Sequence, residues 1–247
     1  MSRPLPRMLV IAAVAFALLA PASQALTGWG LTASEFSESG NDTLRAAGYA
    51  FSIWSLLYLG MAAYALYQAL PASDASPVRD PLAWPSILAI AGCGAWICAS
   101  GLDWRWATVA IIVASAAVLI AGLLRVGPQA RTASLRDRLL ILWPLAALAG
   151  WLTVASAINI LTVLTAEGFI GPETALTAGL IGIAVVLVVA VLVLRASRMP
   201  VYGLPIAWGL VAVWVAERGD NPLAAFAALG AAILVLVAAG LTARSRA

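Results

Sequence analysis

The segment Ala46–Leu70, AAGYAFSIWSLLYLGMAAYALYQAL, places aromatic side chains in a run that is otherwise almost wholly apolar. The run is long enough to form an α-helix across the hydrocarbon core of a bilayer, which takes roughly 20 residues. Within it, Phe51, Trp54 and Tyr58 follow at spacings of three and four residues, so they share one helix face. The segment predicts a membrane-spanning helix whose aromatic stripe packs between helices, anchors the helix at the interface or lines a ligand site.

The composition of the whole chain supports a membrane setting. Of its 247 residues, 63% are hydrophobic and only 10% are charged. A soluble domain has roughly 45–50% apolar and about 25% charged residues, so this chain has too little polar surface to remain in water. We therefore expect an integral membrane protein whose first partner is the lipid bilayer. Its net charge of +3 does not indicate nucleic acid binding, because the arginines flank the apolar spans.

Apolar runs recur along the chain and predict a polytopic, all-α helix bundle. Asp220, Asn221 and Pro222 form a helix start, and Gly171 to Thr174 form another, with Glu173 at the positive end of the helix dipole. The longest segment between spans, 27–48, is polar and has room for one short helix. We expect eight transmembrane helices, at about 8–26, 49–70, 83–101, 105–125, 139–165, 174–195, 201–217 and 222–242.

Arginines divide unequally between the two sides that eight alternating spans create. Arginines are enriched on the cytoplasmic side of membrane proteins. If the N-terminus is cytoplasmic, 11 of the 14 basic residues lie inside, and only Arg45, Arg105 and Arg218 lie outside. We therefore expect both termini in the cytoplasm. An alternative for residues 1–25 is a cleaved signal peptide, since Arg3, Arg7 and the PASQA sequence before Leu26 also fit that pattern.

Several kinds of chemistry are excluded by missing residue types. The chain has no lysine for a Schiff base and no histidine for a metal, a haem or general base catalysis. Cys93 and Cys98 point about 140° apart on one helix, so we expect packing roles for both and no disulfide or metal site. Each Asp, Glu and Arg falls near a predicted helix end, where Glu217 and Arg218 are expected to pair locally. We predict no catalytic residues, no metal and no required cofactor.

The polar groups that remain inside the spans are the candidates for a site. Asn159 is open to two interpretations, an interhelical hydrogen bond or a place in a pocket wall. Trp54, Trp96 and Trp151 lie further inside the spans than the other tryptophans. An interior indole requires a partner for its N–H or access to a polar cavity, so these three are candidates for a cavity wall.

Two segments resemble the TspO/translocator family, also called tryptophan-rich sensory proteins. YAFSIWSLLYLG is similar to the start of that family's second helix at Phe51, Trp54 and Tyr58. WLTVASAIN is similar to its fifth helix at Trp151, Ala155 and Asn159, and Trp96 corresponds more loosely to a third-helix tryptophan. The family's polar first loop is not recognisable between residues 27 and 48. The chain is identified as a divergent, extended member, with a five-helix core at 1–170 and three additional transmembrane helices at 171–247.

The resemblance implies a receptor-like ligand-binding protein in the bacterial inner membrane, a sensor or regulator with a possible homodimer as partner. Its ligand would be a tetrapyrrole such as protoporphyrin, or another flat apolar molecule. The implied ligand-binding residues are Phe51, Trp54, Tyr58, Trp96, Trp151, Ala155 and Asn159.

Two alternatives come from other classes of protein. A small-solute permease would use eight helices, with Pro144 or Pro205 breaking a helix at the binding site. An intramembrane enzyme would degrade porphyrin through tryptophan photochemistry, although no acid–base or nucleophile constellation supports it. We favour the non-enzymatic ligand-binding protein.

Overall fold

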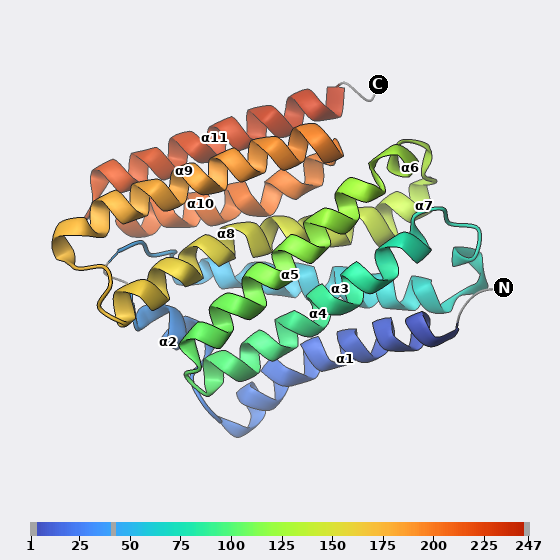
Figure 1. Cartoon of the computed structure of the whole chain (residues 1–247), viewed down its shortest axis with the longest axis horizontal. Helices are drawn as coiled ribbons and strands as arrows, with labels where there is room; N and C mark the ends of the chain where they lie inside the picture. Colours follow the sequence, from blue (N-terminus) through green and yellow to red (C-terminus); the bar gives the residue numbers. More distant parts are fainter. Residues whose placement is uncertain (1–3, 41–42, 245–247) are drawn as a thin grey trace.

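The computed structural model describes residues 4–40 and 43–244, and within this part of the chain all regular structure is helical (Figure 1). Eight helical segments are long and apolar enough to cross a membrane, which confirms the predicted class and number of spans. The long helices in them are α1 (Pro4–Thr27), α3 (Ile53–Ala69), α4 (Arg79–Gly101), α5 (Arg105–Arg125), α8 (Trp143–Ala166), α9 (Pro172–Ser197), α10 (Gly203–Glu217) and α11 (Pro222–Arg244).

Short helical turns connect or extend these spans. The helix α2 (Ala33–Glu38) lies in the polar segment after α1, where the sequence left room for one short helix. The remaining turns are η1 (Gly48–Ser52), η2 (Pro71–Ser73), α6 (Gly127–Thr132), α7 (Leu135–Asp137), the π-helical turn η3 (Arg138–Leu142) and η4 (Pro200–Tyr202).

The helix α8 occupies the centre of the bundle. It packs against α3 and α5 on one side and against α9 and α10 on the other, while α4 joins α5 to α1. In Figure 1 the three C-terminal helices α9, α10 and α11 lie side by side along one flank. The last three helices therefore reach the rest of the bundle mainly through α8.

A close approach of backbones joins α8 to the turn before α10. A β-carbon at Gly150 would lie 2.1 Å from the carbonyl oxygen of Tyr202, so only glycine fits there. Beside it, the hydroxyls of Thr153 and Tyr202 lie 2.7 Å apart. Pro144 and Pro205 occur within the first turn of α8 and α10, and the π-helical turn η3 leads directly into α8 before Pro144.

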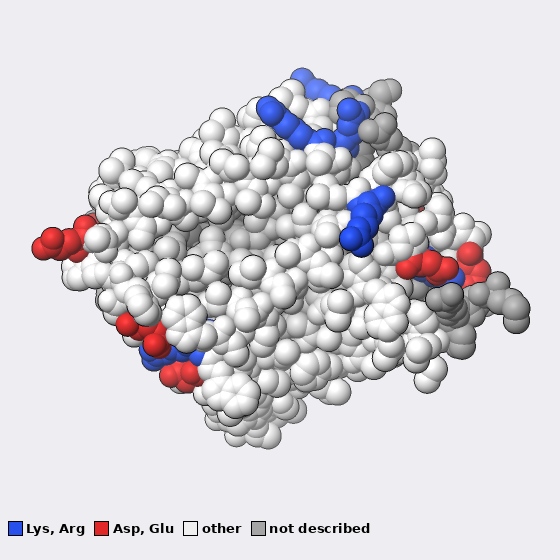
Figure 2. Space-filling view, in the orientation of Figure 1, with Lys and Arg blue, Asp and Glu red and all other residues white. Residues whose placement is uncertain are grey.

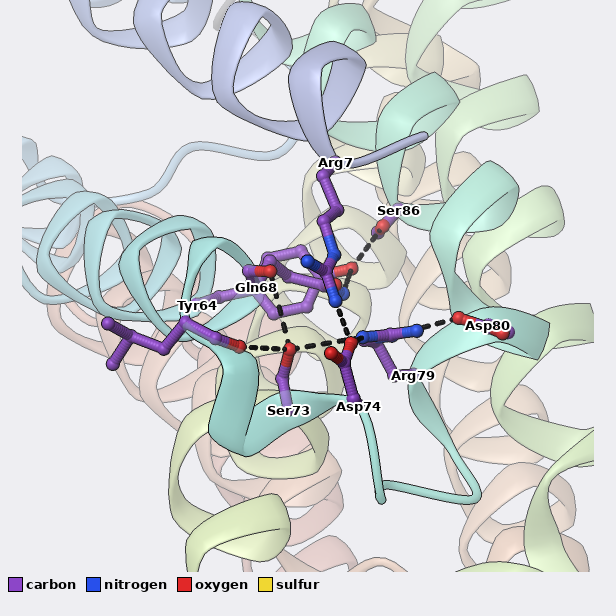
Figure 3. A network of polar contacts seen from close by, with 9 residues as sticks. Arg7, Tyr64, Gln68, Ser73, Asp74, Arg79, Asp80 and Ser86 are labelled. Atoms are coloured by element: carbon purple, nitrogen blue, oxygen red, sulfur yellow. Dashed lines mark hydrogen bonds and ion pairs between the residues drawn. The ribbon is translucent and has the colours of Figure 1, made fainter. Parts of the chain in front are cut away.

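A polar network, here called the polar clamp, holds the α3–α4 connection (Figure 3). Arg79 donates from Nε to Asp80 at 2.8 Å and from Nη1 to Ser73 at 3.2 Å, and it forms an ion pair with Asp74. Arg7 of α1 forms an ion pair with the same Asp74. Because Arg79 has these partners it is only 4% exposed, and α4 begins at Arg79 instead of the expected residue 83. The members of the clamp are Arg7, Tyr64, Gln68, Ser73, Asp74, Arg79, Asp80 and Ser86.

The clamp continues along α3 and α4 through neutral groups. Gln68 donates from Nε2 to the hydroxyl of Tyr64 at 2.8 Å, and that hydroxyl lies 2.6 Å from the hydroxyl of Ser86. All three side chains are at most 2% exposed. A buried polar group without a partner costs about 1–3 kcal/mol, so this pairing lets α3 and α4 pack closely at their clamp end.

Acidic and basic side chains are distributed unequally between the two ends of the bundle (Figure 2). The loops at the α2 end include Glu38, Glu173 and Asp220, whereas most arginines lie at the clamp end. The alternating helices thus produce the charge division that the sequence predicted, and the cytoplasmic location of the termini remains a prediction. The expected local pair of Glu217 with Arg218 is wrong: Glu217 pairs with Arg45, and Arg218 lies over the ring of Trp214. The partner of the buried Glu217 thus comes from a distant segment of the chain, and Arg218, the next residue at the same helix end, does not pair with it.

Candidate functional site

A mostly apolar cavity lies between α2, α3, α4, α5 and α8, at the opposite end of α3 and α4 from the clamp. Its empty volume is about 720 Å³, which includes the spaces between atoms and the part that opens outward. Its walls are formed by Ala33, Phe36, Ser37, Ala46, Ala50, Phe51, Trp54, Gly92, Cys93, Trp96, Ile112, Ser115, Trp151, Leu152, Ala155, Ile158, Asn159 and Thr162.

The structure brings six of the seven predicted site residues to this one cavity. They come from η1 and α3, from α4 and from α8, segments far apart in the sequence: Phe51, Trp54, Trp96, Trp151, Ala155 and Asn159. The seventh, Tyr58, does not line the cavity. It stacks on Trp54, with ring centroids 5.3 Å apart and an interplanar angle of 26°. Tyr58 therefore supports the aromatic wall from one side.

Helical periodicity explains the wall that α8 contributes. Trp151, Ala155 and Asn159 are spaced by four residues, and side chains at this spacing lie on one face of a helix. Ala155 carries the smallest of the three side chains and leaves room between the indole above and the amide below. The face of α8 toward α3, α4 and α5 is therefore concave at its middle.

Two indoles form one corner of the cavity. The rings of Trp54 and Trp151 meet edge to face, with centroids 6.3 Å apart and an interplanar angle of 83°. Aromatic pairs prefer this arrangement, because the positive ring edge meets the negative ring face. The pair joins α3 to α8 and presents aromatic surface to the cavity.

Asn159 fulfils both roles that the sequence left open. It lines the cavity, and its Oδ1 accepts a hydrogen bond from Nε1 of Trp96 at 2.9 Å. Its Nδ2 donates to Oγ1 of Thr108 at 3.0 Å, so one side chain links α8 to α4 and α5. These bonds fix the Trp96 ring, whose edge contacts Phe36 at a centroid distance of 5.8 Å.

Trp151 differs from Trp96 because its N–H lacks a partner. Within residues 4–40 and 43–244, no atom accepts a hydrogen bond from its buried Nε1. The residue is only 4% exposed. Its Cζ3 edge lies against α10, where a β-carbon at Gly209 would be 3.6 Å away, so the N–H edge is turned from that helix. One residue of the cavity wall thus carries a buried hydrogen-bond donor that has no acceptor within the described residues.

The helix α2 covers the cavity, a role that the sequence did not reveal. Thr32 and Glu35 form a capping box: the Glu35 N–H donates to the Thr32 hydroxyl at 3.2 Å, and the Thr32 N–H donates to the Glu35 carboxylate at 2.7 Å. These bonds hold the pKa of Glu35 below its ordinary value. The next residue, Phe36, is 1% exposed and points into the cavity wall. The spacing Thr-x-x-Glu before an aromatic residue was the available signal.

The segment after α2 is fixed to α8 and α10. A β-carbon at Gly40 would lie 2.0 Å from the carbonyl oxygen of Thr162 in α8, so the chain crosses α8 in close contact. Arg45 donates to Glu217 of α10 from its backbone N–H at 2.8 Å and from Nε at 3.3 Å, and it pairs with Asp220. Hydrogen bonding to Asp220, together with the charge of Glu217, raises the pKa of Arg45. The cover is therefore held by polar contacts at its outer edge.

The cysteines have different positions in this arrangement. Cys93 lines the cavity, is 5% exposed, and donates its thiol to the carbonyl of Ala89 at 3.3 Å. Cys98 is half-buried, and both thiols are free. Cys93 thus belongs to the core, as expected, and also contributes to the cavity wall.

These features define an all-helical integral membrane protein with an aromatic cavity between its helices. The sequence model of the family described as TSPO-like protein matches residues 7–241, and the chain belongs to this family. The match includes α9 and α10 and most of α11, so it extends well beyond the expected core at 1–170. Comparison with curated proteins and with solved structures found no match.

Proposed function

We propose that this protein binds a flat, mostly apolar ligand in the cavity between α3, α4 and α8, as a sensor or regulator of TspO type. The observation that supports this best is the convergence of Trp54, Trp96 and Trp151 on one cavity with a free indole N–H. Ring faces bind flat molecules through dispersion, and a few directed polar groups orient them. A tetrapyrrole is the ligand class that we propose first, and protoporphyrin is the probe of its ring system.

The wall residues have different roles in binding. Trp54 and Trp151 offer aromatic surface, and Trp151 offers a donor to an acceptor on the ligand. Trp96 is held by Asn159 and serves as a fixed wall. The side chain of Ala155 sets the depth of the cavity.

A titration with protoporphyrin tests the proposal. The purified protein in detergent is titrated while tryptophan fluorescence and the Soret absorbance of the ligand are recorded. We expect saturable quenching that Trp54→Phe combined with Trp151→Phe weakens at least about tenfold, since stacking and one hydrogen bond are lost. Trp84→Phe is the matched control, because Trp84 is 52% exposed on the outside of α4. Quenching that is unsaturable, or equal in the double variant, contradicts the proposal.

A further inference from the structure

A second hollow, here called the vestibule, adjoins the cavity at the α2 end. It lies between α2, the segment 45–48 and the end of α10, and its empty volume is about 760 Å³. Ser37, Ala46 and Phe51 line both the vestibule and the cavity. A ligand whose body fills the cavity would therefore extend into the vestibule past these three residues.

The polar groups of the vestibule differ from those of the cavity. Glu38 contributes an exposed carboxylate that lies 3.4 Å from the hydroxyl of Ser34, and Ser37 contributes a second hydroxyl. Arg45 is the one cation among the described residues that line the vestibule. The vestibule is thus suited to a polar or charged group, whereas the cavity is suited to rings and hydrocarbon.

The charge of Arg45 is already balanced by neighbouring carboxylates. Glu217 accepts two hydrogen bonds from Arg45 and is 5% exposed, and Asp220 forms a second ion pair with it. Of the two charged residues that line the vestibule, Glu38 has no ion pair with a described residue and Arg45 has two, so the lining charges and the partners of Arg45 together sum to −2. An anionic ligand would have to displace a carboxylate from Arg45, while a cation would meet an uncompensated one at Glu38.

The wider surroundings have the same sign. Seven acidic residues described in the structure lie at this end of the bundle against three arginines, Arg45, Arg105 and Arg218. Figure 2 shows acidic side chains at this end and mainly arginines at the other. The acidic residues are Glu35, Glu38, Asp103, Glu167, Glu173, Glu217 and Asp220.

We propose that the vestibule is a subsite for a cationic group, and that the ligand is amphipathic, with a flat apolar body in the cavity and an amine beside Glu38. This inference rests on the proposed function and specifies the class of ligand. The ammonium group would donate to Glu38 and to the hydroxyls of Ser34 and Ser37, while the rings contact Trp54 and Trp151. A carboxylate at the same position would be repelled.

A series of porphyrins that differ only in charge tests the subsite. The probes are protoporphyrin free acid, its dimethyl ester, and its diamide with a dimethylaminoethyl amine, each titrated in uncharged detergent. We expect the cationic diamide to bind about fivefold tighter than the ester and the free acid to bind weakest, as partly exposed charges interact by up to about 1 kcal/mol. The difference between diamide and free acid should decrease as salt is added.

Two substitutions locate the effect. Glu38→Gln should reduce the preference for the diamide to about twofold or less, and Glu38→Arg should reverse it in favour of the free acid. Glu173→Gln is the matched control, since Glu173 is exposed at the same end but lines neither hollow. Its order of affinities should equal that of the unchanged protein.

The outcomes separate the two proposals. Equal affinities for the three porphyrins, or tightest binding of the free acid, overturn the cationic subsite while the proposed function stands, provided that Trp54→Phe with Trp151→Phe weakens binding. A preference that Glu38→Gln leaves unchanged also overturns the subsite. Absence of saturable binding by all three porphyrins overturns the proposed function, and the subsite with it.

Discussion

The two ends of α3 and α4 differ in the hydrogen-bond partners of their buried polar side chains. At the clamp end, Tyr64, Gln68 and Arg79 are buried, and each forms a hydrogen bond to another side chain. At the cavity end, Trp151 is buried equally deeply and its N–H has no partner. Nε of Arg7 at the clamp end also lacks a partner, but the side chains of Tyr64, Gln68 and Arg79 join α3 to α4 there through hydrogen bonds, and breaking such bonds in the interior is costly. We expect substitutions in the clamp to change the free energy of unfolding and substitutions in the cavity to change affinity.

The largest effect is expected for Arg79→Leu in the clamp. The substitution removes the ion pairs of Arg79 with Asp74 and Asp80 and its hydrogen bond to Ser73, so the free energy of unfolding should fall by about 2–3 kcal/mol, although Asp74 keeps Arg7. Thermal unfolding in detergent, followed by circular dichroism, measures it. Arg125→Leu is the control, because Arg125 is exposed at the same end of the bundle. Equal stability of the Arg79 variant and the control would show that the clamp does not stabilise the fold.

Ala155→Phe tests the cavity end by adding a side chain, whereas Arg79→Leu removes one. A phenyl ring on this half-buried wall position would occupy the space between Trp151 and Asn159, so affinity for protoporphyrin should fall at least about tenfold, or about 1.4 kcal/mol. Thermal unfolding of the same variant measures the cost of fitting the ring at this position. Unchanged affinity in the folded variant would mean that the ligand binds elsewhere.

Trp151→Phe removes only the indole donor and part of the ring. We expect affinity to fall about fivefold, the equivalent of one hydrogen bond of about 1 kcal/mol, and stability to fall less than in Arg79→Leu, because the removed N–H is unpaired and only part of the ring is lost. Titration and thermal unfolding of the same sample compare the two quantities. A loss of stability as large as that of Arg79→Leu would contradict the separation of the two ends.

A double-mutant cycle on Trp96→Phe and Asn159→Leu measures the one polar bond that holds the cavity wall. Hydrogen bonds between membrane helices average about 0.6 kcal/mol, and we expect a coupling energy of that size. The free energy of unfolding is measured for the four proteins of the cycle. Additive effects would mean that the indole of Trp96 is fixed by packing against Phe36 alone.

The smallest effect concerns the cover and pH. The pKa of Glu35 is lowered in the folded state, so its capping bonds stabilise α2 above the ordinary carboxyl pKa, and this contribution is lost as pH falls through the lowered value. Hydrogen exchange of the Thr32 amide should therefore quicken in acid relative to an amide within α8. In Glu35→Gln the acid-dependent part should disappear. If the exchange of the Thr32 amide depended on pH identically in the two proteins, the carboxylate of Glu35 would be excluded as the cause of the acid dependence.

Much of the fold follows from the sequence. Apolar length determines the eight spans, and four-residue spacing places Trp151, Ala155 and Asn159 on one face of α8. Tyr58 follows Trp54 by four residues and so shares its helix face, yet it does not line the cavity. Just beyond it, a β-carbon at Gly60 would lie 3.3 Å from Pro144, so α3 closes against α8 there. The spacing of residues along one helix does not reveal where a second helix packs against it and closes the cavity.

The rest of the site depends on contacts between distant segments. Phe36 reaches the cavity because the cover crosses α8 at Gly40 and Thr162, a contact that no local pattern encodes. The vestibule depends on Arg45 pairing with Glu217 across the fold, where the sequence suggested the neighbouring Arg218. Tertiary packing therefore decides which polar residues of the loops belong to the site.

The most direct test of the central claim is the indole N–H spectrum of the tryptophans during a protoporphyrin titration. Nuclear magnetic resonance of ¹⁵N-labelled protein in detergent resolves the indoles, and Trp→Phe variants assign them. We predict a saturable shift of the Trp151 N–H, which gains an acceptor, a smaller shift of Trp96, which keeps its bond to Asn159, and none at Trp84. A fixed Trp151 resonance with shifts at Trp84 would place the ligand on the outer surface and contradict the account.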